Sequence, residues 1–398
     1  MRLTLFALAF SVLANGSEPR HLELSDGSAE FEWLNASIFR ILRTWHPNTA
    51  PKSPASLLLE SSNLRVEIDP LTAAVNVKTA AGKPLANLAG PVRGPGKIIL
   101  ETRLAPGERV FGNTGAIAES PFLFTSAGYG QTVQRGLKYL VDVKPDRVRI
   151  TSQGSDTIEY FFLYGPNPKE IFEQRRVAIP IPDTLPLRTV DLDHLTCEAV
   201  QQLNAESLAA TFYAVNAGPR WESFLGAYIR EIHDRGLPIF RPLLLQFPKT
   251  PEFGKQMSVT MFGDEIILAP KCAAPFTLPQ GIWTDMKSGV QHNGRSLVEL
   301  ADDVTLFARN GTIVPLRLPD KVELHYFPKL GAEFFIFEPQ ENEYSQVHAS
   351  EAGDFWRLEI ESKVTRKYEW VLHHIGENPK RIPVEAKAGA DNIINLPI

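Results

Sequence analysis

A helical period that continues into an apolar stretch constrains the fold of this chain more than any other feature. Apolar side chains recur at i, i+3, i+4, i+7, i+8 and i+11, at Trp221, Phe224, Leu225, Tyr228, Ile229 and Ile232. This spacing places them on one face of an amphipathic helix, for which Pro219 suits the first turn and Gly236 the C-terminal cap. An apolar stretch at residues 236–248 follows directly. The sequence therefore predicts a helix that leads into a buried strand, which is half of an α/β crossover unit.

Length and composition are typical of a globular protein with more than one domain. The 398 residues suffice for about two or three domains, and 43% hydrophobic with 22% charged residues is ordinary. A net charge of −5 argues against a nucleic-acid partner or an anionic membrane surface. No run after residue 16 reaches the roughly 18 to 20 apolar residues of a membrane helix. We therefore expect no membrane span.

The first 16 residues have the pattern of a signal peptide. Arg2 precedes the apolar run LTLFALAFSVLA, and small residues suited to cleavage follow near Ala14 and Gly16. The alternative is an N-terminal core strand. With a signal peptide at residues 1–16, we expect a secreted or periplasmic protein.

Two cysteines, Cys197 and Cys272, are too few for a disulfide framework. They can form one bridge if their Cα atoms lie close together, which the sequence does not determine. We expect buried free thiols.

Residues 30–164 have the pattern of an all-β region. Short apolar or alternating runs such as NLRVEID, KIILETRL and IEYFFLYG are separated by Gly, Pro, Asn and Asp. Regular short strands with turn residues between them predict an antiparallel β-sandwich.

Several segments, in the right order, resemble one family. GAYIREIHDRGLPIFRPLLLQFPKTPE and FGDEIILAP are similar to the last barrel helix, last barrel strand and following linker of glycoside hydrolase family 31, the α-glucosidase and α-xylosidase family. LRVEIDPLTAAVNVKTAAGKPL and IEYFFLYGPNPKEIFEQ resemble its N-terminal sandwich and the exit helix, here near residues 168–176. LPQGIWTDMKSG and ELHYFPKLGAEFFIFEPQENEYSQV resemble its two C-terminal β-domains. The resemblance also shows where this chain departs from the family.

The main departure is in the barrel. A (β/α)₈ barrel takes about 250 residues, whereas residues 177–235 are all that precede the predicted last strand. The segment Asp191-Leu192-Asp193-His194-Leu195 aligns with the seventh-strand motif of the family, and Ala214-Val215-Asn216 with the segment that carries its eighth-unit arginine and histidine. The other six units are absent. A substrate-facing loop of the sandwich is also missing, because only residues 116–119 lie where the family has a long segment.

The resemblance leaves no catalytic residue to assign. Retaining hydrolysis needs two carboxylates about 5 to 5.5 Å apart, and the family has both on the missing units. Asp191 aligns with a residue that contacts and supports the ligand. Trp283-Thr284-Asp285-Met286 imitates the nucleophile signature Trp-x-Asp-Met-Asn-Glu, but Lys287-Ser288 follows, so we interpret Asp285 as part of a strand and turn.

The candidate carbohydrate-binding residues are therefore Asp191, Asn216, Trp283 and Tyr129, the last two as aromatic faces. Asp191, Asp193 and His194 could hold a metal, but at a strand end they are better explained by capping, with Thr196 as N-cap of the next helix. His373 and His374 lie on a β-like run, and we expect them at the surface. We expect no metal and no cofactor.

The sequence predicts a mainly β fold with a small α/β part. After the signal peptide we expect a galactose-mutarotase-like sandwich at residues 17–176, a remnant of the last two barrel units at 177–250, and C-terminal β-sandwich domains at 251–318 and 319–398. The sandwich and C-terminal assignments follow from the resemblance as well as from the strand pattern.

Four interpretations of function remain open. The first is a non-catalytic relative that binds an oligosaccharide or α-glycoside. The second is an active glycosidase whose missing strands come from a second copy or another chain. The third is a structural partner that pairs its exposed strand edges with an intact homologue, since unpaired edges favour association. The fourth is a shortened gene product whose function has decayed.

Overall fold

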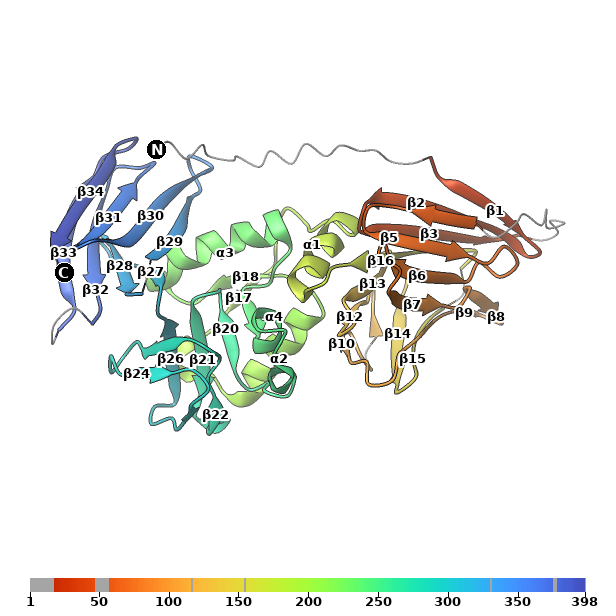
Figure 1. The fold of residues 1–398 in the computed structure, drawn as a ribbon, viewed down its shortest axis with the longest axis horizontal. Helices are drawn as coiled ribbons and strands as arrows, with labels where there is room; N and C mark the ends of the chain where they lie inside the picture. Colours follow the sequence, from red (N-terminus) through yellow and green to blue (C-terminus); the bar gives the residue numbers. More distant parts are fainter. Residues whose placement is uncertain are drawn as a thin grey trace. The chain divides into compact units, whose positions relative to one another are not determined.

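The computed structural model describes residues 18–46, 57–115, 117–153, 155–329, 331–374 and 378–397. The chain divides into two compact units, Met1–Ile179 and Pro180–Ile398 (Figure 1). The predicted signal peptide, residues 1–16, lies outside the described residues. None of the helices in the described ranges is both long and apolar enough to cross a membrane.

The first unit is a sandwich of two antiparallel sheets, as predicted. One sheet has the spatial order β1 (Arg20–Leu24), β2 (Gly27–Asn35), β3 (Ile38–Trp45), β16 (Thr157–Tyr164), β13 (Tyr129–Val133), β12 (Phe122–Thr125) and β10 (Val110–Gly112). The other has the order β11 (Ile117–Ala118), β14 (Tyr139–Lys144), β15 (Arg147–Gln153), β9 (Lys97–Arg103), β7 (Pro84–Leu88), β6 (Val75–Thr79), β5 (Leu64–Ile68) and β4 (Leu57–Glu60), and β8 (Val92–Gly94) pairs with β9. Burial alternates along strands such as β2 and β15, because successive side chains point to opposite faces.

Helix α1 (Pro168–Ala178) ends the first unit where the exit helix is predicted. The side chain of Asn167 caps it by accepting a hydrogen bond from the backbone N–H of Glu170, and Pro168 occupies its first turn. Phe172 is buried and packs edge-on against Phe122 of β12. The helix is thereby fixed to the sandwich by its apolar face.

The second unit begins with one crossover of parallel strands. Strand β17 (Leu187–Thr189) leads through the 3-10 turn η1 (Leu192–His194) and helix α2 (Cys197–Leu208) to β18 (Ala214–Asn216), which pairs parallel with β17. The 3-10 turn η2 (Pro219–Trp221) and helix α3 (Glu222–Arg235) follow, and Gly236 ends α3 in the left-handed region at φ 70°. Glycine adopts this conformation without a Cβ penalty, so the predicted cap is confirmed.

Helix α3 buries the stripe that its period predicts. Trp221, Phe224, Tyr228 and Ile232 are all buried. The ring of Phe224 stacks on Phe334 at 5.7 Å and lies 4.9 Å from the ring of Phe262. The helix therefore packs directly against strands of the C-terminal β-region.

The prediction of one continuous strand at residues 236–248 is wrong. Only β19 (Phe240–Pro242) is extended, and it pairs antiparallel with β20 (Thr260–Phe262), not with β18. A helical turn, α4 (Leu243–Gln246), follows, and then the 3-10 turn η3 (Pro251–Gly254). Pro238 and Pro242 lack the N–H that a central strand donates to its neighbours, which limits the strand to three residues.

Four further sheets complete the second unit. Beyond β19 and β20, the largest contains β21 (Ile266–Pro270), β26 (Val304–Arg309), β23 (Ile282–Asp285) and β24 (Gln291–Asn293), and β22 (Phe276–Thr277) pairs with β25 (Leu297–Val298). The last two have the orders β27 (Thr312–Arg317), β28 (Val322–Phe327), β32 (Arg366–Leu372), β33 (Lys380–Ala386), and β29 (Gly331–Glu338), β30 (Glu343–Ala352), β31 (Phe355–Glu361), β34 (Asp391–Pro397). The proposed border at residue 318 thus falls between two paired strands, β27 and β28. One hydrophobic core joins the largest of these sheets and the last two to α2 and α3.

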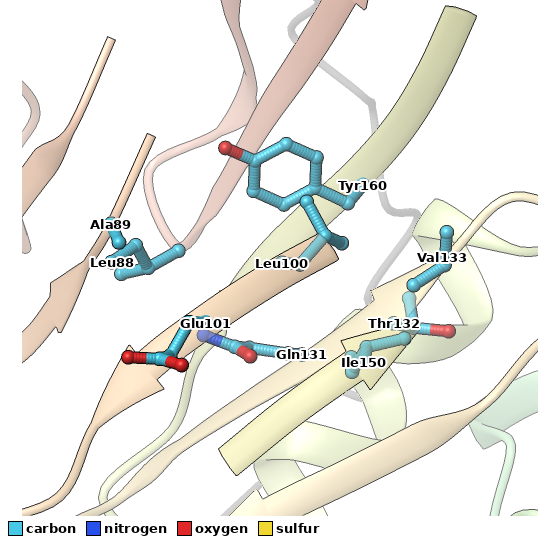
Figure 2. A pocket seen from close by; sticks show the side chains of 9 residues that line it. All are labelled: Leu88, Ala89, Leu100, Glu101, Gln131, Thr132, Val133, Ile150 and Tyr160. Carbon is cyan, nitrogen blue, oxygen red and sulfur yellow. The ribbon is translucent and has the colours of Figure 1, made fainter. Parts of the chain in front are cut away.

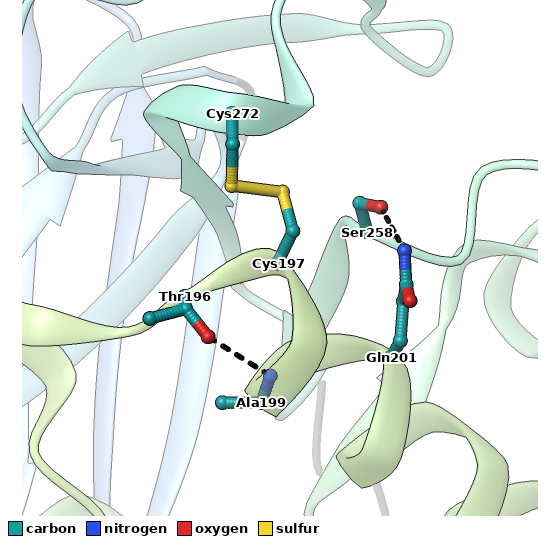
Figure 3. Close-up of a disulfide and its surroundings, with 6 residues drawn as sticks. All are labelled: Thr196, Cys197, Ala199, Gln201, Ser258 and Cys272. Atoms are coloured by element: carbon teal, nitrogen blue, oxygen red, sulfur yellow. Dashed lines mark hydrogen bonds between the residues drawn. A yellow bond between two sulfur atoms is a disulfide. The ribbon is translucent and has the colours of Figure 1, made fainter.

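Cys197 and Cys272 form a disulfide with a Cα–Cα distance of 6.1 Å (Figure 3), so the expectation of free thiols is wrong. Cys197 opens α2, and Cys272 lies in the 3-10 turn η4 (Lys271–Ala273) that follows β21. The two residues are 75 positions apart in the sequence. Their approach depends on α2 packing against the C-terminal sheet, which no local pattern encodes.

Candidate functional site

The two parallel strands end at one edge, and they bring Asp191 and Asn216 to it. Thr189 of β17 is opposite Asn216 of β18, and the N–H of Val190 donates to the Asn216 carbonyl at 2.9 Å. In α/β crossovers, ligands bind beyond the carboxyl ends of the strands. This edge is therefore the place in the second unit where a site is expected.

Asp191 is a cap and the partner of a histidine. Its carboxylate accepts from the Asp193 N–H at 3.1 Å and lies 2.9 Å from His194 Nδ1. The hydrogen bond with His194 lowers the pKa of Asp191 and raises that of His194. Thr196 caps α2 by accepting from the Ala199 N–H at 3.2 Å. The prediction that this segment caps the following helix is confirmed.

Asn216 shapes the turn that leaves β18. Its side-chain oxygen accepts from the Gly218 N–H at 3.0 Å, and Gly218 has a φ of 89°. A residue with a Cβ adopts this φ only with strain. The turn leads from β18 into η2 and α3.

A cleft of about 660 Å³ opens beside this edge. Its lining residues come from four separate segments and from β28: residues 193, 217–221, 285–287, 302–306 and 325. The predicted site residues Asp191 and Asn216 are not among them, although each is close in sequence to a residue that is. We refer to this feature as the cleft throughout.

Polar groups of both kinds face the cleft. Lys287 Nζ pairs with Asp302 at 2.7 Å, and Asp285 accepts from the backbone N–H of Lys287 at 2.8 Å. Within the ranges that the structure describes, the side chains of Asp193 and Arg220 have no hydrogen bond or ion pair. A free carboxylate and a free guanidinium supply acceptors and donors together, which suits a ligand with several hydroxyl groups.

His325 lines the cleft and is part of a buried network of hydrogen-bonded side chains. Its Nε2 lies 3.0 Å from a Glu323 carboxylate oxygen, and its Nδ1 lies 3.0 Å from Nε2 of His373. Arg381 holds the other Glu323 oxygen at 2.6 Å. Because His373 is buried and stacks on Phe327 at 4.3 Å, the expectation that it lies at the surface is wrong. The adjacent His374 is exposed.

The two aromatic candidates do not face a ligand. Trp283 is 0% exposed and donates from Nε1 to the Pro279 carbonyl at 2.9 Å. Tyr129 is 1% exposed and stacks on Phe162 at 5.2 Å inside the sandwich. Stacking on a sugar needs an accessible ring face, so these two assignments are wrong. Asp285, the residue after the Trp283-Thr284 pair, ends β23 and caps a turn, as the sequence predicts.

The first unit contains a much smaller cavity (Figure 2). Its volume is about 10 Å³, and Leu88, Leu100 and Ile150 form part of its wall. The buried hydroxyls of Thr132 and Tyr160 also border it and have no hydrogen-bond partner among the described residues. A space of this size holds about one water molecule and is too small for a sugar.

Arg220, Asp302 and Asp303 are cleft residues that no sequence motif predicts. Arg220 follows the turn after β18, and the aspartates lie in the loop before β26. The only available signal is the acidic pair in ELADDVTL, which also fits an ordinary surface loop. No group of three or more His, Cys, Asp or Glu residues in the described part of the chain could hold a metal ion.

Comparison with known proteins identifies a family domain within the second unit. Residues 236–314 match the glycosyl hydrolase family 31 C-terminal domain. The α-glucosidase of Saccharolobus solfataricus is 29% identical over 90 residues, 22% of this chain and 13% of that enzyme. Alpha-glucosidase 2 of Bacillus thermoamyloliquefaciens is 24% identical over 196 residues, 40% of this chain and 24% of the relative. The matches thus span at most about a quarter of these curated relatives.

Solved structures show the same fold over most of this chain. The GH31 dextranase of Flavobacterium johnsoniae, complexed with glucose, matches with a TM-score of 0.74 at 11% identity, over 94% of this chain and 97% of the dextranase. A mutant of that dextranase was complexed with isomaltotriose. The GH31 α-xylosidase of Xanthomonas citri matches with a TM-score of 0.63 at 10% identity, over 94% of this chain and 99% of the xylosidase. With the domain match and the related α-glucosidases, this identifies the chain as a member of glycoside hydrolase family 31.

Proposed function

We propose that this chain is a non-catalytic member of its family that binds a neutral, α-linked saccharide in the cleft. The observation that supports this most strongly is the position of the cleft, at the carboxyl ends of β17 and β18. Barrel enzymes bind their substrates at this end of the strands. A shortened crossover that keeps such a cleft keeps the place for a ligand.

The side chains around the cleft fit a polyhydroxylated ligand. Asp193 and Asp285 offer carboxylate oxygens to sugar hydroxyls, and Arg220 offers N–H donors. Charged partners strengthen such hydrogen bonds. Glucose and isomaltotriose, the ligands of the related dextranase, make glucose units linked by α-bonds the first class to test.

The chain connectivity supports the proposal that the protein is non-catalytic. Residues 179–186 are the whole connection between α1 and β17, where a complete barrel has its other units. Retaining hydrolysis needs two carboxylates about 5 to 5.5 Å apart at one anomeric carbon, and the resemblance places both on those units. Asp191 has a lowered pKa because His194 hydrogen-bonds to it, which is unsuitable for a general acid.

Export of the protein is part of the proposal. Arg2 and the apolar run at residues 3–14 support a signal peptide, and the bridge between Cys197 and Cys272 is typical of oxidising compartments. Mass spectrometry of the protein recovered from its native host should find an N-terminus near Ser17. An intact Met1 in the recovered protein would contradict export by this route.

Titration calorimetry with isomaltotriose tests the binding proposal. We expect a Kd on the order of 1 mM, about 4 kcal/mol of binding free energy, and at least about fivefold weaker binding by Asp193→Asn and Arg220→Met, since each removes about 1 kcal/mol of hydrogen bonding. Asp354→Asn, in the exposed turn between β30 and β31, is the matched control and should bind as the parent does. No heat from the parent, or equal binding by all variants, would refute the cleft as the site.

A further inference from the structure

The disulfide fixes the segment that carries Asp193 into the cleft. Residues 191–196 lie between two attachment points: the pairing of β17 with β18 and the bridge from Cys197, the first residue of α2, to Cys272. Figure 3 shows the bridge at the N-terminal end of α2, one residue after the Thr196 cap. Between these points Leu192 and Leu195 are buried in the hydrophobic core. Cutting the bridge therefore removes one attachment of the segment and leaves this burial in place.

The two sulfur-bearing residues differ in accessibility. Cys197 is buried, at 7% exposure, whereas Cys272 lies in the exposed turn η4. Thiol–disulfide exchange requires a thiolate to approach one sulfur directly, so access decides which sulfur is attacked. Cys272 is the more exposed of the two residues, so we expect attack at its Sγ, with Cys197 as the leaving group.

We propose that this bridge is a redox-responsive tether of the cleft wall, opened by a dithiol that attacks Cys272. In the first step the thiolate of the dithiol forms an S–S bond with Cys272 Sγ, and the Cys197–Cys272 bond breaks to leave the Cys197 thiolate, which takes up a proton. The second thiol of the reductant then displaces Cys272 as a thiol. The chain gains two electrons and two protons, and the reductant becomes a cyclic disulfide.

The rest of α2 stays anchored when the bridge opens. Asn204 Nδ2 donates to the carbonyls of Met257 at 2.8 Å and Val259 at 2.9 Å, and Ser207 donates to the Phe240 carbonyl. Nearer the bridge, Gln201 donates to the Ser258 hydroxyl at 2.8 Å. Opening the tether therefore loosens residues 191–199 and leaves the second half of the helix in place.

Mapping the mixed disulfide tests the direction of attack. The native full chain is treated with glutathione, quenched with acid, alkylated and digested. We expect glutathione on Cys272 in at least about tenfold excess over Cys197. Glutathione mainly on Cys197, equal labelling, or labelling only in denaturant would overturn the proposal.

Hydrogen exchange tests the tether itself, independently of any ligand. Three samples are compared: oxidised protein, dithiothreitol-reduced protein and the double variant Cys197→Ser/Cys272→Ser. The reduced protein and the double variant should exchange amide hydrogens at residues 193–199 at least about fivefold faster than the oxidised protein. Exchange at residues 203–208 should be the same in all three. Exchange rates that rise equally along the whole of α2, or that do not change, would contradict the tether.

The coupling of the tether to the cleft rests on the proposed function. If oxidised protein binds isomaltotriose, reduction should weaken binding at least about threefold, and unchanged affinity would refute the coupling. If oxidised protein binds no saccharide, the proposed function fails and so does the coupling. The labelling and exchange results still decide whether the tether exists.

Discussion

The ring of Tyr228 occupies the space that a side chain at Gly263 would need. An ideal Cβ on Gly263 would lie 2.7 Å from the Tyr228 hydroxyl oxygen and closer still to two carbons of its ring. The same hydroxyl donates to Glu265 and accepts from the Asp264 N–H at 2.9 Å. The guanidinium of Arg241 lies 5.3 Å from the Tyr228 ring centroid. The glycine therefore permits a buried polar network between α3 and the sheet that contains β20 and β21.

Gly263→Ala should lower the free energy of unfolding by about 2 to 4 kcal/mol, because it adds a steric clash to a strained positive φ. Gly353→Ala is the matched control: its φ is 64° against 65° at Gly263, but no atom lies within 4 Å of the added Cβ. The control should lose only about 1 kcal/mol. Urea unfolding of both variants measures the difference, and equal losses would show that the Tyr228 contact costs nothing.

Phe224→Ala should cost about 3 to 5 kcal/mol of unfolding free energy, since it leaves a cavity where Phe224 meets Phe334 and Phe262. Phe355→Ala makes the same chemical change at a ring that is 46% exposed and should cost less than about 1 kcal/mol. Thermal unfolding of the two variants beside the parent checks this. A Phe224 variant that melts with the parent would mean that the stripe of α3 is not packed.

The sequence predicts those parts of the fold that depend on local pattern. The period from Trp221 to Ile232, the Thr196 cap and the Gly236 stop are each encoded within a few residues, and the structure confirms all three. The apolar stretch after Gly236 misleads because apolar runs occur in strands and in buried turns alike. The prolines of this stretch and its antiparallel pairing with β20 limit the strand to residues 240–242.

The candidate site is less predictable, because it depends on which loops meet. Asp191 and Asn216 reach one strand edge because β17 and β18 pair in parallel. Arg220 and Asp302 come from loops without periodicity, and only tertiary packing brings them to one cleft. Trp283 fails as a candidate because accessibility is a property of the whole fold, and a strand tryptophan is as often a core residue.

Lowering the pH from 7 to 5 should destabilise the protein through His373. Burial, with the nearby charge of His325, lowers the pKa of His373 to about 3, against about 6.5 in the unfolded chain. The unfolded state therefore binds a proton that the folded state does not, and stability falls as the pH drops below 6.5. The contribution between pH 7 and 5 is about 2 kcal/mol. Urea unfolding at the two pH values should show that His373→Asn loses about 2 kcal/mol less stability between pH 7 and 5 than the parent does. An equal loss in the two proteins would contradict the lowered pKa of His373.

Glu265 should act in the opposite direction. Burial, then the charge of Asp264, raises the pKa of Glu265 to about 7 from its ordinary 4.5. The stability from its protonated form is complete below pH 4.5 and is lost as the pH rises through 7. Glu265→Gln stays neutral and still accepts from Tyr228, so its stability relative to the parent should increase by up to about 3 kcal/mol between pH 4.5 and 8. A constant difference across this range, in unfolding titrations of both proteins, would contradict the raised pKa.

The proposal that this protein binds a saccharide without hydrolysing it is tested most directly by a hydrolysis assay on monodisperse parent protein. Aryl α-glucosides and aryl α-xylosides are the substrates, and Asp191→Asn is assayed beside the parent under the conditions of the isomaltotriose titration. Hydrolysis needs two carboxylates at one anomeric carbon. Both oxygens of the Asp191 carboxylate already have partners, the backbone N–H of Asp193 and the imidazole of His194. We expect saccharide binding with no turnover above the buffer rate. Turnover by the parent that Asp191→Asn abolishes would contradict it and make Asp191 catalytic.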